Sequence, residues 1–180
     1  MTVRPDDTGV PVRVDAVTFR GDSFRWPIYY GYRVGHAIGR RGVWIEAEFL
    51  HLKVIANQES LAPPVESFAI THGMNFILVN VVWAAPEHDR ARVGWMVRAG
   101  LGPTLPHAES RVDGRWQEGY ELGGAGIQLA PGIVVRVTRV LRMTGEYKFT
   151  FARPSVEVAG GHALAAVRTH HVAWGLAAAF

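Results

Sequence analysis

The last eleven residues of the chain alternate strictly between large apolar and small side chains. Val172, Trp174, Leu176 and Phe180 share one face of an extended strand, whereas alanine and glycine occupy the other face after residue 172. Successive side chains of a strand point to opposite faces, so this strand has one bulky apolar face and one small face. Such a pattern is typical of the closing strand of a barrel that points its large side chains into lipid.

Composition limits how the chain can cross a membrane. The most apolar run, residues 77–85, is interrupted by Asn80, and no window reaches the roughly 18 apolar residues of a membrane helix. Any crossing must therefore be made of strands. The length of 180 residues predicts one domain over residues 1–180. The 19 Lys and Arg residues are scattered rather than clustered, which argues against nucleic acid as a partner.

Strand-like segments with a period of two alternate with breaks rich in glycine, proline and charge. The strands are predicted over residues 10–19, 28–38, 43–55, 68–83, 92–103, 120–137, 141–151 and 163–180. Short breaks, at 39–42, 86–90 and near 138, alternate with longer polar ones at 56–67, 104–119 and 152–162. This layout predicts an all-β fold, an eight-stranded antiparallel up-and-down transmembrane β-barrel. Its first strand, near residues 10–19, is short.

Two segments set an apolar face against a charged face, and in the second segment the charges are of both signs. In residues 92–102 the charged face carries Arg98, and in residues 144–151 it carries Glu146 and Lys148. A soluble, lipocalin-like barrel with an apolar ligand inside would show the same alternation with the two faces exchanged. The membrane interpretation is favoured because the many large aromatic side chains would crowd a small interior. Trp83 and Trp95 also flank one short turn, as an interfacial aromatic belt requires.

On the membrane interpretation, charged and polar side chains from four strands face the lumen. They are Glu46, Glu48, Arg92, Arg98, Gln128, Arg136, Glu146 and Lys148. Each buried charge needs a partner, so we expect a network of ion pairs that fills the barrel as a structural plug. A proton or ion route is the alternative, which no other sequence feature supports.

Six of the eight histidines fall on the long-loop side of the predicted barrel. They are His51, His72, His107, His162, His170 and His171, whereas His36 and His88 lie near the short turns. Imidazole is a common metal ligand, so a divalent metal bound by His51, His72, His107 and His171 is one interpretation, with Asn75 or Glu109 as oxygen ligands. The other is that these amphipathic rings simply sit at the membrane interface. By parity, His171 points into the lumen and His170 outward.

Several stretches together resemble a family of small outer-membrane barrels from Gram-negative bacteria that includes the lipid A oxidases. The stretches are residues 27–33, 49–54, 71–76 (Thr-His-Gly-Met-Asn-Phe), 100–107 (Gly-Leu-Gly-Pro-Thr-Leu-Pro-His), 119–128, 146–148 (Glu-Tyr-Lys) and 169–180. The resemblance implies an eight-stranded barrel and the oxygen-dependent oxidation of the proximal glucosamine of lipid A to an aminogluconate unit, assisted by a divalent metal. The polar residues of these stretches are the candidates for the site. The resemblance implies metal ligands at His51, His72 and His107 and catalytic residues at Lys53, Asn75, Glu146 and Lys148.

The chain departs from this family at its start. Family members carry a full strand before the region that matches residues 14–33, where this sequence has about a dozen residues. The opening Met-Thr-Val-Arg-Pro-Asp-Asp also contains no apolar leader, so an outer-membrane location would require a signal peptide that these residues do not provide.

Three functions remain open from the sequence. The first is a monomeric outer-membrane barrel with a structural or loop-presenting role in the envelope, whose partners are the lipid bilayer and lipopolysaccharide. The second is a lipid A oxidase, and the third is the soluble carrier. The first is preferred because the pattern identifies architecture more firmly than chemistry.

Overall fold

The computed structural model describes residues 1–6, 9–26, 28–39, 42–85 and 92–178. Several predicted features lie outside these residues: Phe180, His88, Pro27 and the centres of the short turns at 39–42 and 86–90. Within the described chain there are thirteen strands and one short 3-10 helix, η1 (Gln58–Ser60). None of the described helices is long and apolar enough to cross a membrane.

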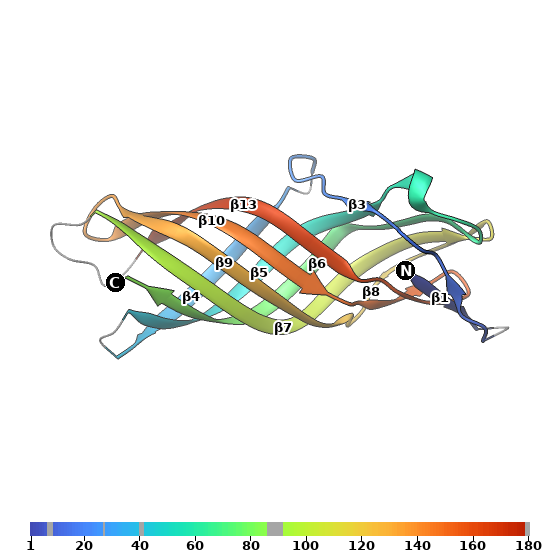
Figure 1. Cartoon of the computed structure of the whole chain (residues 1–180), viewed down its shortest axis with the longest axis horizontal. Coiled ribbons are helices and arrows are strands. Elements are labelled where there is room, and N and C mark those ends of the chain that lie inside the picture. Colours follow the sequence, from blue (N-terminus) through green and yellow to red (C-terminus); the bar gives the residue numbers. More distant parts are fainter. Residues whose placement is uncertain (7–8, 27, 40–41, 86–91, 179–180) are drawn as a thin grey trace.

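Seven long strands form the wall of an elongated barrel (Figure 1). They are β4 (Tyr30–Ile38), β5 (Val43–Ala56), β6 (Val65–Ala84), β7 (Val93–Val112), β9 (Gly124–Arg136), β10 (Leu141–Ala152) and β13 (Val167–Ala178). Each pairs antiparallel with the next in this order, as an up-and-down barrel requires. The prediction of an all-β, antiparallel up-and-down barrel is confirmed at this level.

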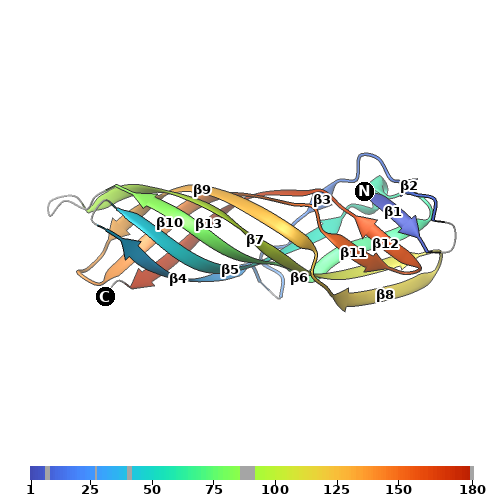
Figure 2. The same ribbon diagram turned by 90° about the horizontal axis from the view of Figure 1, so that it is seen from below.

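The shorter strands gather at the end of the barrel with the long connections (Figure 2). β1 (Thr2–Pro5), β2 (Val12–Arg13), β11 (Ser155–Val158) and β12 (Gly161–Leu164) form a separate four-stranded sheet. β3 (Phe19–Arg20) pairs with β5, and β8 (Arg115–Tyr120) forms a hairpin with β7. Much of the sequence that was predicted as long polar loops is therefore strand.

The predicted barrel strand over residues 10–19 is wrong. Only β2 and the first residue of β3 are extended there, and neither joins the row of wall strands from β4 to β13. A turn at Asp15 and Ala16 interrupts the segment, and Ala16 adopts a positive φ of 54°. A residue with a side chain rarely takes this conformation inside a strand, so the local chain reverses instead of crossing the barrel.

The barrel wall has one open seam. No ladder joins β4 to β13 within the described residues, so the wall contains seven long strands rather than the eight predicted. Both strands run toward the end with the short connections, whereas every wall pairing is antiparallel.

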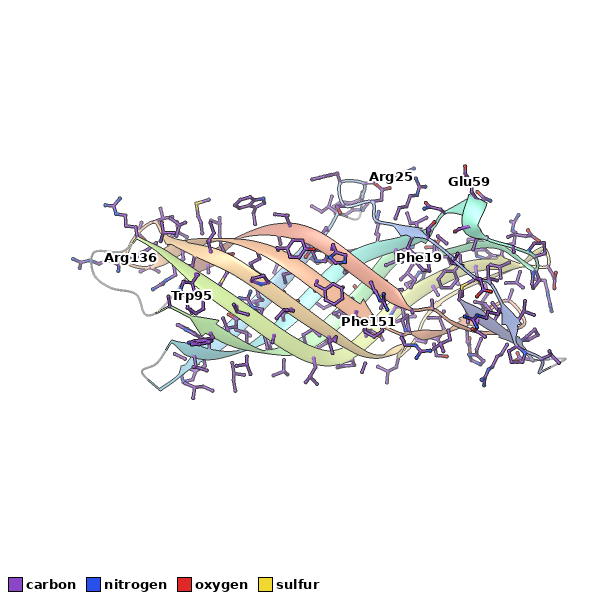
Figure 3. The ribbon with its side chains drawn as sticks, viewed as in Figure 1. Phe19, Arg25, Glu59, Trp95, Arg136 and Phe151 are labelled. Carbon is purple, nitrogen blue, oxygen red and sulfur yellow. The ribbon has the colours of Figure 1, made fainter. Side chains whose placement is uncertain are left out.

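The two halves of the barrel have opposite interiors. Near the short connections the outer wall is apolar, with Ile77, Val81 and Trp174 at least half exposed, while polar groups face inward. Figure 3 labels Trp95 on the wall near the short connections and Phe151 closer to the middle of the barrel, near the other end of β10. Near the long connections the interior is an apolar core that includes Phe68 and Val156. The soluble lipocalin-like alternative would put apolar side chains inside the half near the short connections, whereas polar side chains such as Arg98 and Glu146 are buried there.

Aromatic side chains mark the short-connection end of the wall. The rings of Trp83 and Trp95 lie 5.5 Å apart at an angle of 77°, close to the edge-to-face geometry that aromatic pairs favour. Both side chains are about half exposed on the outer wall. This position is the one expected for an interfacial belt.

Gly102 allows β6 and β7 to approach closely. A Cβ atom at this position would lie 1.9 Å from the carbonyl oxygen of Ile77 and 3.0 Å from the Cα of Leu78. Both neighbours are backbone atoms, so the two strands would have to separate. Gly102→Ala should lower the free energy of unfolding by about 1–3 kcal/mol, as urea unfolding in lipid vesicles followed by tryptophan fluorescence would show.

The matched control for this change is Gly119→Ala on β8, where an added Cβ meets nothing within 4 Å. We expect that change to stay within about 0.5 kcal/mol of the parent protein. Equal stability of the two variants would contradict the close approach at Gly102.

Candidate metal centre on the outer wall

The lumen of the barrel half near the short connections is filled by ion pairs. Arg98 is almost fully buried, and its Nε lies 2.6 Å from Glu46 Oε2 while its Nη1 lies 2.7 Å from Glu146 Oε2. Arg33 Nη1 donates to the second oxygen of Glu146 at 2.6 Å. The carboxylate of Glu146 is thus held between two guanidinium groups, each of which makes a charge-assisted hydrogen bond to one of its oxygens.

A second part of the network surrounds Glu48. Lys148 Nζ donates to Glu48 Oε1, and Asn80 Nδ2 donates to Glu48 Oε2 at 2.9 Å. Gln128 Nε2 donates both to Glu48 and, at 2.6 Å, to Asn80 Oδ1. Glu146 and Lys148, two of the predicted catalytic residues, therefore lie in the lumen and already have partners there.

Three polar side chains and one backbone carbonyl form a row on the outward side of the wall strands, where His51 and Asn75 are nevertheless almost fully buried. Tyr30, His51, Asn75 and Leu105 are register partners on four neighbouring strands, and all share the outward parity of their strands. The Tyr30 ring stacks on His51 with centroids 4.8 Å apart. His51 Nδ1 lies 2.9 Å from Asn75 Oδ1, and Asn75 Nδ2 donates to the Leu105 carbonyl at 3.0 Å. This row orients the His51 ring.

An irregularity in β6 changes the direction of His72. The register between β6 and β7 shifts between Ala69 and Met74, and Gly73 adopts a φ of 127°. Glycine is required there, because the conformation is rare for other residues and an added Cβ would lie 2.5 Å from His51 Nδ1. Strict alternation would send His72 inward. Instead its side chain is 60% exposed and reaches Glu109 on β7.

Three side chains on β6 and β7, which we call the rim cluster, lie close enough to share one metal ion. These are His72, His107 and Glu109, whose ligand atoms all lie within 4.8 Å of one another. His72 Nδ1 lies 2.8 Å from Glu109 Oε1, and His107 Nδ1 lies 3.8 Å from the same oxygen. The two imidazole rings are 5.0 Å apart.

The rim cluster fits a divalent metal by its donor set. Two imidazoles and one carboxylate are the protein ligands of many catalytic zinc sites, which keep a further position open for water or substrate. His107 Nδ1 is buried and has no hydrogen-bond partner in the described part of the chain, so it is free to coordinate. His72 is the exposed member, and the open position would therefore face outward.

Two neighbouring side chains support the rim cluster and were not predicted. Thr71 Oγ1 donates to Glu109 Oε1, and Tyr120 donates to the carbonyl oxygen of His72 at 3.3 Å. The Tyr120 ring packs against His107 with centroids 4.4 Å apart. Such outer contacts orient metal ligands. The sequence signal for Thr71 was its adjacency to His72, whereas Tyr120 becomes a neighbour only through the β7–β8 hairpin.

The remaining predicted site residues lie apart from the rim cluster. His171 faces the lumen, as its parity predicted, with its ring 4.9 Å from that of Tyr29. Lys53 Nζ donates to the carbonyls of Arg25 and Trp26 at 2.8 and 3.1 Å, so it anchors the segment before β4. Of the four histidines predicted as ligands, the structure brings together His72 and His107, and Glu109 completes the set.

Comparison with known proteins supports the architecture. No protein-family model matches the chain, and no curated protein matches it in sequence. Its fold is similar to the crystal structure of Neisserial surface protein A, with a TM-score of 0.53 over 84% of each chain and 15% sequence identity. This likeness shows that the chain has the fold of an outer-membrane β-barrel, and its apolar outer wall and ionic lumen are consistent with that fold. It shows the fold and no activity.

Proposed function

We propose that this protein resides in the bacterial outer membrane, binds a divalent metal at the rim cluster and acts there on the lipid A of the outer leaflet. The observation that carries the proposal is the outward direction of His72, His107 and Glu109 on the long-connection half of the wall. A ligand set that points away from the lumen is accessible to a lipid beside the barrel. A buried plug residue is not.

The reaction that the family resemblance implies is an oxidation at the anomeric carbon of the proximal glucosamine. On a lipid A whose anomeric hydroxyl carries no phosphate, the anomeric centre loses one hydrogen from the carbon and one from the hydroxyl, together two electrons and two protons, and becomes a lactone. Dioxygen takes up these electrons and protons and becomes hydrogen peroxide. Water then opens the lactone to the aminogluconate. A bound divalent metal would supply Lewis-acid or redox assistance at the rim cluster.

The protein's own groups would position the sugar and move its protons. Asn75 holds His51 Nδ1, and Nε2 of the same ring has no hydrogen-bond partner within the described residues. His51 is only 3% exposed, so this nitrogen can act as a general base only toward a group that reaches it inside the wall. The His51 ring packs against the backbone of Gly73, where an added Cβ would lie 2.5 Å from its Nδ1. We therefore assign proton transfer to His51 rather than to Glu146 or Lys148.

Lipid A mass spectra test this function. Aerobic cells that express the protein should contain lipid A with one added oxygen atom, and the species should disappear without oxygen. His72→Ala and His107→Ala should abolish it, whereas His162→Ala, an exposed histidine of β12, should leave it unchanged. Identical aerobic spectra with and without the gene would overturn the proposal.

A structural role in the envelope is the second candidate, and the closed ionic lumen favours it. Among the described residues, Arg98, Glu146, Glu48 and Lys148 are each paired with one another or with neighbours, so none of these four is a free charge in the lumen. This role predicts that deleting the gene sensitises cells to detergent, and that the histidine variants restore resistance as fully as the parent protein. Failure of the histidine variants to restore resistance would favour the enzyme.

A further inference from the structure

A loop with two large aromatic side chains protrudes from the barrel between β3 and β4. Within residues 22–26, which we call the aromatic loop, Phe24 is 98% exposed and Trp26 is 83% exposed. These are the highest exposures among the large hydrophobic residues of the described chain. Figure 1 shows this part of the chain standing away from the wall, and Figure 3 labels Arg25, which lies between the two aromatic residues, on the outer side of the barrel.

The aromatic loop is held in place by the neighbouring strand β5. Lys53 Nζ, on the outward face of β5, donates to the carbonyl oxygens of Arg25 and Trp26 at 2.8 and 3.1 Å. The backbone N–H of Tyr29 donates to the carbonyl oxygen of Ser23 at 3.0 Å, which closes the turn. β3, which enters the loop, also pairs with β5. The exposed side chains therefore project from a backbone that is fixed on both sides.

Residue counting along β5 gives the height of the aromatic loop on the wall. Val43 is the register partner of Trp83, which belongs to the aromatic pair at the short-connection end. Lys53 lies ten residues further along the same strand. A tilted strand crosses the hydrocarbon of a bilayer in about 9–11 residues. Tyr30 and Tyr32, with rings 5.7 Å apart, add aromatic groups next to the loop. The loop thus lies at the opposite interface of the same bilayer.

Arg25 provides a positive charge at this interface. Its side chain is exposed, and its guanidinium makes no ion pair or hydrogen bond with another described residue. A guanidinium binds phosphate through two parallel hydrogen bonds, and such charge-assisted bonds are stronger than neutral ones. Phe24 and Trp26 flank this charge in the chain. Aromatic rings favour the boundary between headgroups and acyl chains, so the loop combines the two chemistries that a phospholipid presents at one depth.

We propose that the aromatic loop is a binding site for one lipid with an anionic phosphate headgroup. The phosphate lies on the Arg25 guanidinium, and the rings of Phe24 and Trp26 enter the lipid where the headgroups meet the acyl chains. The acyl chains run along the apolar outer wall. The inference rests on the membrane location proposed above, but on neither the metal nor the oxidation.

Spin labels on single cysteines test the depth of the loop, because the chain contains no cysteine. The barrel would be folded into vesicles of equal parts phosphatidylcholine and phosphatidylglycerol. A label at Phe24→Cys should be accessible to dissolved oxygen and shielded from a water-soluble nickel complex. Leu129→Cys on the outer wall is the control for hydrocarbon, and Arg115→Cys, an exposed position of β8, is the control for water.

The two controls separate failure of the loop from failure of the membrane location. If the label at position 24 were as accessible to nickel as the label at position 115, while the label at position 129 stayed shielded, the loop would lie in water. The inference would then be wrong and the membrane location would stand. Nickel access at position 129 as well would overturn the membrane location, and the inference with it.

Lipid titration tests the role of Arg25. Native mass spectrometry of the purified barrel would measure binding of dioleoylphosphatidylglycerol and of dioleoylglycerol, which has the same acyl chains and no phosphate. Arg25→Gln should weaken binding of the phosphate lipid about fivefold and leave binding of dioleoylglycerol unchanged. Arg111→Gln, at an exposed position of β7, should change neither affinity. An unchanged affinity for the phosphate lipid in Arg25→Gln, or an equal loss for both lipids, would overturn the assignment.

Discussion

Replacing Arg98 by methionine is expected to lower the free energy of unfolding by about 3–5 kcal/mol. The side chain is buried in the lumen and pairs with Glu46 and Glu146. Glu146 would keep its bond to Arg33, but Glu46 would lose both of its contacts with Arg98. An unpaired carboxylate in a narrow lumen has little water to replace its partner. Urea unfolding in lipid vesicles measures the loss.

The control for this prediction lies on the same strand. Arg111→Met removes the same group from an exposed position of β7 and should change stability by less than about 0.5 kcal/mol. Adding Glu46→Gln to Arg98→Met should restore part of the lost free energy of unfolding, because it removes the carboxylate charge that Arg98→Met leaves unpaired. If Arg98→Met and Arg111→Met were equally stable, the lumen would have to be hydrated well enough to solvate its charges.

Replacing His107 by alanine should weaken metal binding at the rim cluster by at least about 100-fold. The estimate follows from the 10–100-fold cost of changing a group that merely supports a ligand, which the loss of a ligand itself should exceed. Titration of the purified barrel with Co²⁺, followed by its visible absorption, measures the affinity and reports the coordination geometry. Glu109→Gln should weaken binding in the same direction.

His170→Ala is the matched control for the metal titration. His170 also projects from the outer wall, where its Nδ1 lies 2.6 Å from the Tyr147 hydroxyl, but it does not belong to the rim cluster. Its replacement should leave the Co²⁺ affinity unchanged. Loss of binding in this variant, or full binding in His107→Ala, would place the metal elsewhere.

The alternation of side chains along each strand explains which lumen residues could be predicted from the sequence. Glu46, Glu48 and Arg98 were expected in the lumen from alternation alone, and the structure pairs them there. Alternation works in these segments because their ladders are regular and the two faces meet opposite environments. The wall strands from β5 to β13 follow the predicted order for the same reason.

Irregular backbone accounts for much of what the sequence could not predict. His72 points outward because β6 loses its register before Met74, and a single glycine does not reveal where such a shift falls. Tyr120 reaches the rim cluster through the β7–β8 hairpin, which crosses a region predicted as a loop. Pairing of this kind depends on contacts distant in sequence, and a local pattern does not contain them.

Along single strands the inward side chains change from polar in one half of the barrel to apolar in the other. This change determines how deeply the barrel would insert into a bilayer. β6 and β7 have 20 residues each, whereas a tilted strand needs only about 9–11 to cross the hydrocarbon. The inward side chains change from polar to apolar between Glu48 and Leu50 on β5 and between Asn80 and Leu78 on β6. Vertical sliding in either direction would carry the apolar outer band into water or the polar outer row into hydrocarbon. The change in polarity along the strands therefore fixes the position of the barrel along the bilayer normal. It keeps the rim cluster at one depth relative to the lipid.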